Sequence, residues 1–198
     1  MRTDNPDAAF QACLAAIEGG IGTIEITTTV PSWYEIVRGL IGSTLGKVPI
    51  GVGTVWDPGA VGEAKEAGAD FVVTPVVLPE VAEACRKQDV LCVLGALSPT
   101  EIYHARLAGA NIVKVFPVGP VGGPDYIRSL QGPMGGVPLW ASGGVEIEHI
   151  PAYLRLGVKA VGLTGALFAP EDLARRDLEA IRHKAGRAAQ AAAEARAD

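Results

Sequence analysis

Signals for β-strands and α-helices alternate along this chain of 198 residues, and no other feature limits its fold as strongly. The strand signals are short apolar runs rich in Val and Ile, with Gly or Pro at most of their ends. We expect strands at residues 23–27, 49–54, 71–75, 91–95, 111–117, 139–142 and 160–164. Strands that alternate with helices across short loops form a parallel sheet covered by helices. We therefore expect an α/β fold with a single domain over residues 1–198.

Eight helices are expected between and around these strands, and the chain begins with one of them. Several residues are placed to cap or open helices: Asn5, Ser32 with Glu35, Ser98 with Glu101, and Pro170. The Ser32–Glu35 spacing predicts a capping box, in which each side chain bonds the backbone amide of the other residue, and residues 98–101 are expected to open a later helix. The last helix is expected to continue into an alanine-rich helical tail at residues 182–198.

The count of seven strands and eight helices predicts a (β/α)8 TIM barrel that lacks its first strand. We hypothesise that the chain is truncated at its N-terminus, because the start is set too late or an upstream segment is lost. Without the first strand, the second and eighth strands of the barrel would present unpaired edges. An open, doubly wound sheet is the alternative, and it requires no missing strand.

A weak internal repeat favours the barrel. Four helices end at glycines that open the next strand, namely Gly20, Gly68, Gly109 and Gly157. The residues five positions after them are Glu25, Val73, Lys114 and Gly162. Barrel interiors are filled by layers of four side chains from alternate strands. These four residues are therefore expected to form one layer, with Glu25 opposite Lys114 and with room left beside Gly162.

Glu25 and Lys114 are the two charges inside the expected strands. A charge in a dry strand costs several kcal/mol unless a partner compensates it. A buried structural salt bridge is one interpretation. Both residues, however, lie toward the carboxyl ends of their strands, where barrel enzymes carry their active sites. We therefore favour a catalytic role for the pair.

Lysine–carboxylate chemistry inside a barrel points to carbon–carbon bond cleavage in a keto acid. A lysine held away from water is neutral part of the time, so its amine can attack a carbonyl and form a Schiff base. Glu25 is placed to transfer the proton that the reaction requires. No cofactor is needed for this chemistry. His104, His149 and His183 are scattered among helices, so we predict no metal site.

Glycine-rich turns after the last two strands predict an anion site. Residues Ser142, Gly143 and Gly144 follow one strand and precede a helix, so their backbone amides can face an anion. Thr164 and Gly165 follow the last strand. The loops after strands seven and eight are where barrels commonly hold phosphate.

Composition excludes some classes of partner. The net charge is −5 and no block of Lys or Arg occurs, which argues against nucleic acid and anionic membrane as partners. No apolar run is long enough to span a membrane. The three cysteines lack metal-binding spacing, so we interpret them as reduced packing residues of a cytoplasmic protein. We interpret Trp33, Trp56 and Trp140 as packing residues as well.

Taken together, these motifs resemble one family, the class I 2-keto-3-deoxy-6-phosphogluconate (KDPG) and 4-hydroxy-2-oxoglutarate (KHG) aldolases. The matching stretches are residues 19–31 (GGIGTIEITTTVP), 51–55 (GVGTV), 66–75 (EAGADFVVTP), 98–101 (SPTE), 112–117 (IVKVFP) and 142–145 (SGGV). They follow the family's order and spacing and cover nearly the whole chain.

The resemblance implies roles for individual residues. It implies that Lys114 forms the Schiff base and that Glu25 transfers protons. It further implies that a group of residues contacts the keto acid or lines its pocket, namely Arg2, Thr54, Pro75 and Phe116. The products would be pyruvate and an aldehyde, and the assembly would be a homotrimer.

Two other functions remain open at this point. One is a sugar-phosphate isomerase or epimerase of the same fold that uses Glu25 without a covalent lysine. The other is a non-catalytic relic of the family, which would bind a small anion.

Overall fold

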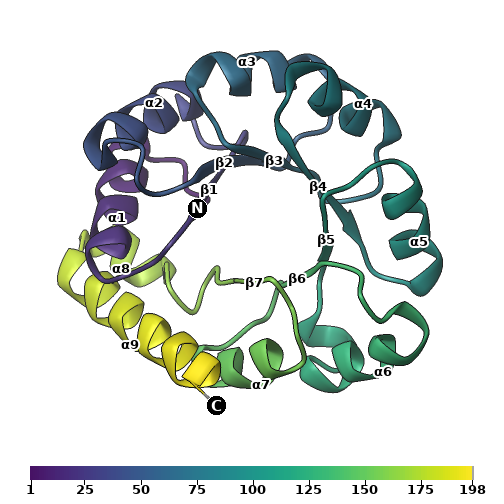
Figure 1. Cartoon of the computed structure of the whole chain (residues 1–198). Coiled ribbons are helices and arrows are strands. Elements are labelled where there is room, and N and C mark those ends of the chain that lie inside the picture. Colours follow the sequence, from purple (N-terminus) through teal and green to yellow (C-terminus); the bar gives the residue numbers. More distant parts are fainter. Residues whose placement is uncertain (198) are drawn as a thin grey trace.

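Seven parallel strands, paired in the order in which they occur in the chain, curl around a common centre in the computed structural model, which describes residues 1–197 (Figure 1). The strands are β1 (Ile24–Thr27), β2 (Ile50–Gly53), β3 (Phe71–Val73), β4 (Leu91–Ala96), β5 (Ile112–Val115), β6 (Leu139–Ser142) and β7 (Ala160–Gly162). Every expected strand is therefore present. The strands β3, β5 and β7 end two residues earlier than expected, because the last residues of each expected strand belong to the loop that follows it.

Helices surround the sheet on its outer side (Figure 1). They are α1 (Pro6–Glu18), α2 (Trp33–Thr44), α3 (Gly59–Ala67), α4 (Pro79–Gln88), α5 (Pro99–Leu107), α6 (Pro124–Met134), α7 (Ile150–Arg155), α8 (Pro170–Arg175) and α9 (Leu178–Ala197), with 3₁₀-helices η1 (Gly119–Val121) and η2 (Ile147–His149). The expected count of eight helices is therefore wrong for residues 1–197. The closing helix divides at Arg176, whose φ of 52° is left-handed and ends α8.

One of the two expected helix caps forms, and Ser98 caps the helix that it was expected to open. The Asn5 side chain accepts a hydrogen bond from the amide of Ala8 at 3.0 Å. The capping box of Ser98 and Glu101 makes both of its bonds. The capping box expected at Ser32 is wrong, because Ser32 has a left-handed φ of 57° and its side chain makes no capping bond. A side-chain cap normally requires an extended backbone at this position.

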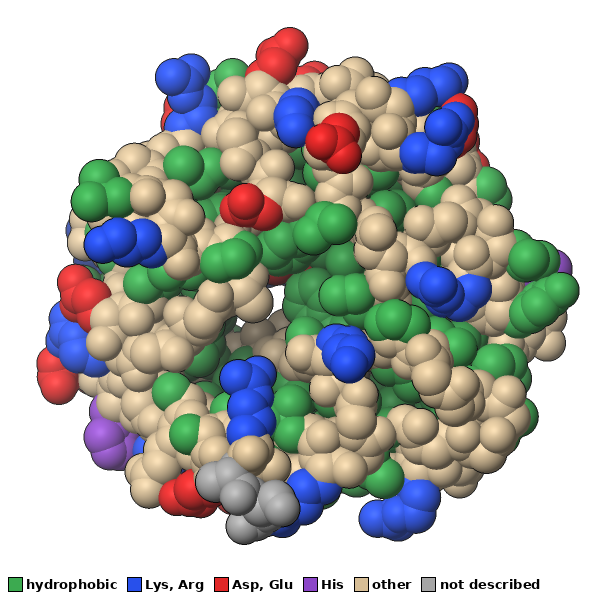
Figure 2. Space-filling view, viewed as in Figure 1, with side chains coloured by type: hydrophobic (Ala, Val, Ile, Leu, Met, Phe, Trp, Pro, Cys, Tyr) green, Lys and Arg blue, Asp and Glu red, His purple; other side chains and the backbone are tan. Residues whose placement is uncertain are grey.

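Side chains of the strands alternate between two apolar regions. Those that point outward pack against the helices in the main core, for example Ile26, Val52 and Leu94. Those that point inward form a smaller cluster inside the curled sheet, composed of Phe71, Val73, Val93 and Trp140. In the space-filling view, hydrophobic side chains border a hollow at the centre of the molecule (Figure 2).

The sheet stays open between β1 and β7, which are its two edge strands. Beside β1, the amino group of Met1 donates a hydrogen bond to the carbonyl of Glu25. The amide of Thr27 donates to the carbonyl of Met1 at 3.2 Å. These two bonds follow the parallel-ladder pattern, so Met1 lies where a strand preceding β1 would end. The open sheet confirms that these residues form a barrel without its first strand.

Helices α1 and α9 pack together outside this opening (Figure 1). They approach closely at Gly19, where an added Cβ would lie 2.5 Å from the Cβ of Ala185. The alanine-rich tail is thus helical as far as Ala197, and Asp198 lies outside the described residues. Among residues 1–197, no helix is both long and apolar enough to cross a membrane.

Candidate active site

Lys114 and Glu25 meet inside the curled sheet, as the internal repeat predicts. Lys114 is on β5 and Glu25 on β1, and the lysine Nζ lies 3.4 Å from both carboxylate oxygens. Their side chains are 12% and 16% exposed, so the pair is largely withdrawn from water yet reachable from solvent. A cation and an anion at this distance compensate each other's desolvation.

Two glycines make room for the pair and its surroundings. An added Cβ at Gly53 would lie 1.8 Å from Glu25 Oε1, so the carboxylate occupies the space that a side chain on β2 would fill. An added Cβ at Gly162 would lie 2.7 Å from both the Trp140 Nε1 and the Ser142 Oγ. The predicted room beside Gly162 therefore exists, and the ends of these two side chains border it.

Two aromatic rings flank the lysine. Its Nζ lies 5.5 Å from the ring centroid of Phe116 and 5.6 Å from that of Trp140. Trp140 packs in the inner cluster, as expected from the sequence, but sequence reasoning did not anticipate that its ring faces the lysine. The signal that could have found it is strand alternation, because Trp140 pairs with Lys114 in register and shares the inward face of β6 with Ser142.

Arg2 and Thr54 also lie together, as the resemblance implies. The guanidinium of Arg2 donates a hydrogen bond to the Thr54 hydroxyl at 3.1 Å. Thr54 has a left-handed φ of 60°, which is an outlier for a β-branched residue. Strained backbone of this kind is concentrated at functional sites. Pro75 follows β3, the neighbour of β2, and its carbonyl lies 2.3 Å from the position of an added Cβ at Gly95.

The two glycine-rich turns follow neighbouring strands, since Ser142 pairs in register with Gly162. Ser142 is buried at the end of β6. Gly143 has a φ of 84°, and an added Cβ there would lie 2.8 Å from the Phe116 ring, so only glycine fits this position without strain. No backbone carbonyl of the described residues pairs with the amides of Gly143, Gly144 or Gly165. These donors, next to the exposed Thr164, are available to an anion.

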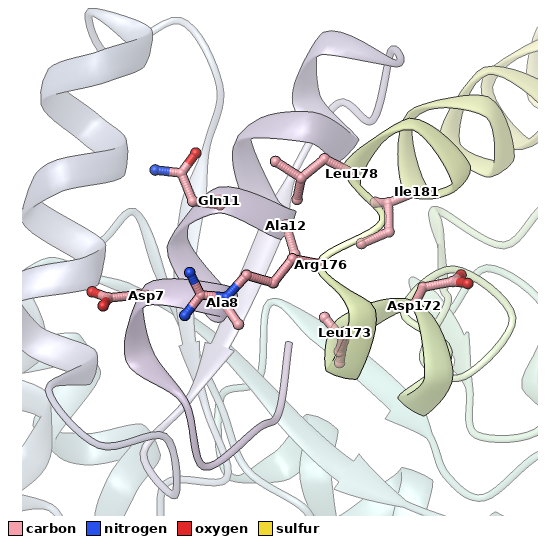
Figure 3. A pocket seen from close by; sticks show the side chains of 9 residues that line it. All are labelled: Asp7, Ala8, Gln11, Ala12, Asp172, Leu173, Arg176, Leu178 and Ile181. Atoms are coloured by element: carbon pink, nitrogen blue, oxygen red, sulfur yellow. The ribbon is translucent and has the colours of Figure 1, made fainter.

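A separate cavity of about 200 Å³ lies between α1, α8 and α9 (Figure 3). It contains none of the predicted site residues. Arg176 reaches from the link between α8 and α9 toward α1 in this view, and Ala8, Ala12 and Ile181 form apolar walls. Within residues 1–197, no group of three His, Cys, Asp or Glu side chains is arranged to hold a metal ion.

The site combines a curled parallel sheet, a partly buried lysine–carboxylate pair inside it and free amides at its rim. These features define an enzyme of the β/α-barrel class. Comparison with known proteins agrees with this. The model of the family "KDPG and KHG aldolase" matches residues 1–184. The chain therefore belongs to the KDPG and KHG aldolase family.

Individual proteins are similar to the chain over most of their length. The 2-dehydro-3-deoxy-6-phosphogalactonate aldolase of Escherichia coli K12 is 29% identical over 169 residues, which cover 85% of this chain and 82% of the relative. A solved native KDPGal structure superposes with a TM-score of 0.88 at 27% identity, covering 98% of this chain and 92% of that one.

A KDPG aldolase from Legionella pneumophila, solved with pyruvate captured as a covalent carbinolamine, has a TM-score of 0.83 at 25% identity and covers 93% and 89% of the two chains. The protein is thus a class I aldolase, a carbon–carbon lyase.

Proposed function

We propose that Lys114 forms the Schiff base with the substrate and that Glu25 transfers the protons. The observation that carries this proposal is the 3.4 Å contact of the two side chains inside the sheet. A group that takes up a proton must lie within hydrogen-bond reach of the reacting atoms, or one water away. The covalent carbinolamine of the Legionella pneumophila relative supports covalent chemistry with pyruvate.

The reaction begins when the neutral amine of Lys114 attacks the C2 carbonyl of the keto acid. The carbinolamine loses water, with Glu25 supplying the proton, and leaves a protonated Schiff base. Glu25 then removes the proton of the C4 hydroxyl. The C3–C4 bond breaks, its electron pair moves toward the nitrogen, and an aldehyde departs from the enamine. Protonation of C3 and hydrolysis release pyruvate and restore the free lysine.

Other residues hold the substrate on either side of this pair. Arg2 and Thr54 bind the carboxylate of the keto acid. Their guanidinium and hydroxyl groups lie side by side, hydrogen-bonded at 3.1 Å, so both can donate to the same carboxylate. Pro75 and Phe116 line the pocket. The other end of the substrate lies against the free amides and hydroxyls of the two turns, formed by Ser142, Gly143, Gly144, Thr164 and Gly165. KDPG and KHG fit this description, and the protein acts in carbohydrate metabolism.

Reductive trapping tests the role of Lys114. Incubation with pyruvate and borohydride is expected to add the mass of reduced pyruvate to a peptide that contains Lys114. The matched control is Lys159→Arg, at the exposed entrance of β7, which should be trapped like the wild type. Lys114→Arg should form no adduct. A folded wild-type protein without an adduct would exclude Schiff-base chemistry and favour the isomerase or relic.

Turnover tests the role of Glu25. Glu25→Gln keeps the shape of the side chain and removes its ability to accept a proton. We expect the adduct with pyruvate to form while turnover falls by about 10²- to 10⁴-fold, the usual contribution of general acid–base catalysis. Turnover close to that of the wild type would assign proton transfer to another group.

We further propose a cytoplasmic homotrimer. Trp56, interpreted from the sequence as a packing residue, is instead 58% exposed in this chain. Val76 is 42% exposed, and the two residues follow the neighbouring strands β2 and β3. Exposed apolar side chains gathered at one edge support a subunit contact. The three buried free cysteines support a reducing compartment. Light scattering should give three times the chain mass of 20.5 kDa, and a monomeric mass would reject the trimer.

A further inference from the structure

The rings around Lys114 suggest a function beyond packing. Phe116 and Trp140 present their rings to the lysine Nζ at 5.5 and 5.6 Å from the two centroids. A cation within about 6 Å of an aromatic ring is attracted to the ring's quadrupole, and Trp gives the strongest such attraction. The attraction grows when the groups are withdrawn from water, as Trp140 is at 7% exposed, whereas Phe116 is 38% exposed and contributes less.

The position of Trp140 is fixed by its neighbours rather than by a hydrogen bond. Phe71 packs edge-on against it, with centroids 6.1 Å apart and planes at 68°. Gly162 leaves the space that the indole nitrogen approaches, since an added Cβ would lie 2.7 Å from Nε1. That nitrogen is buried and has no hydrogen-bond partner among residues 1–197. The indole therefore offers the site its ring, and its N–H group makes no contact that would explain a tryptophan there.

We propose that Trp140, together with Phe116, holds the Schiff-base nitrogen of Lys114 in its protonated form. This inference rests on the proposed function of Lys114. Only the protonated nitrogen accepts the electron pair of the breaking C3–C4 bond, so the fraction protonated limits the rate at neutral and alkaline pH. Two other titratable groups act on this cation. The amino group of Met1, hydrogen-bonded to the carbonyl of Glu25, repels it when protonated. The Glu25 carboxylate faces it at 3.4 Å from Nζ, but it must exchange protons during the cycle. The rings keep their attraction for the cation throughout.

The pH dependence of trapping measures this effect. Cyanoborohydride reduces protonated Schiff bases, so at saturating pyruvate the loss of trapping at high pH reports the protonation of this nitrogen. In Trp140→Leu, we expect the pH at the midpoint of this loss to fall by about 0.5–1.5 pH units. In Trp140→Phe, the midpoint should fall by a smaller amount, because an aromatic ring remains. Turnover should fall most at alkaline pH and least at acid pH. Trp33→Leu, on α2, is the control and should leave the midpoint unchanged.

Fluorinated tryptophan provides a second test that preserves the shape of the side chain, in case Trp140→Leu does not fold. In a chain with Trp33→Phe and Trp56→Phe, incorporated fluorotryptophans change Trp140 alone. Each added fluorine weakens the ring quadrupole, so the midpoint should fall stepwise with fluorine number. An unchanged midpoint in folded, adduct-forming protein would overturn the role of Trp140. Absence of any wild-type adduct at Lys114 would instead overturn the proposed function.

Discussion

A single methyl group at Gly53 should separate Glu25 from Lys114. In Gly53→Ala, the new Cβ would lie 1.8 Å from Glu25 Oε1, whereas ordinary contacts begin at 3.4 Å. The carboxylate must therefore move by on the order of 1.5 Å. The Cδ and Cγ of Glu25 would lie 2.5 and 2.7 Å from the same Cβ, so the whole side chain must rotate. Because all three atoms belong to one side chain and none to the backbone, we expect Glu25 to turn away while the fold is kept. The carboxylate then leaves hydrogen-bond reach of the lysine.

The expected cost is large, because misplacing a catalytic group by about 1 Å can reduce the rate about 10²-fold. Gly53→Ala should lower turnover by about 10²-fold or more. The adduct of Lys114 with pyruvate should still form, because the lysine itself is not touched. Turnover of a 2-keto-4-hydroxy acid, followed through pyruvate release, and mass spectrometry of the borohydride-reduced protein measure the two effects separately.

Gly62→Ala is the matched control. Gly62 lies in α3, and an added Cβ there meets no atom within 4 Å. This variant should keep its turnover and gain about 0.5–1 kcal/mol of unfolding free energy, because alanine is the better helix former. Normal turnover in a folded Gly53→Ala protein would refute the reasoning, since it would mean that the observed position of Glu25 is not the one used in catalysis.

Three further predictions concern strain, capping and pH. Thr54→Gly should relieve the left-handed φ of 60° and raise the unfolding free energy by about 1 kcal/mol, while loss of the hydroxyl that meets Arg2 raises KM. Ser98→Ala should cost about 1 kcal/mol in urea unfolding without changing turnover, because it removes the helix cap of α5. Burial raises the pKa of Cys13 to about 12, so from pH 9 to 12 the folded thiol holds a proton that the unfolded thiol loses. The titration of this thiol should therefore lower the unfolding free energy over this range by up to about 1.4 kcal/mol per pH unit. The unfolding free energy of Cys13→Ala should fall less than that of the wild type between about pH 8 and 10.5.

Each of these has a contradicting result. A less stable Thr54→Gly protein would show that the loop does not store strain at this residue. Unchanged stability in Ser98→Ala would mean that solvent replaces the cap at no cost. If the wild type and Cys13→Ala lose the same unfolding free energy at alkaline pH, another group is responsible for the titration.

The lysine–carboxylate pair could be found from the sequence because strand alternation and the glycine repeat both act through backbone geometry. A side chain five residues after each glycine enters the same layer regardless of what packs around it. The pairing of Arg2 with Thr54 came from the resemblance alone. Its structural reason, the bonds that place Met1 beside β1, depends on contacts between residues distant in the chain.

Trp140 could not be assigned in the same way. Alternation places it on the inward face of β6, but whether its ring turns toward Lys114 depends on Phe71 and on the empty space at Gly162. The failed capping box at Ser32 has a similar cause, since the loop after β1 imposes a left-handed backbone on a serine with suitable spacing. The break of the closing helix at Arg176 likewise has no strong local signal in the sequence.

The sequence by itself determined the parallel sheet, the order of its strands and the two charges inside it, because apolar periodicity and glycine position act over a few residues. The tertiary structure alone decided what surrounds those charges. The 3.4 Å contact, the two rings and the space left by Gly53 and Gly162 arise where strands far apart in the chain face each other. Side-chain packing across the centre of a curled sheet is non-local, so no short stretch of sequence contains it.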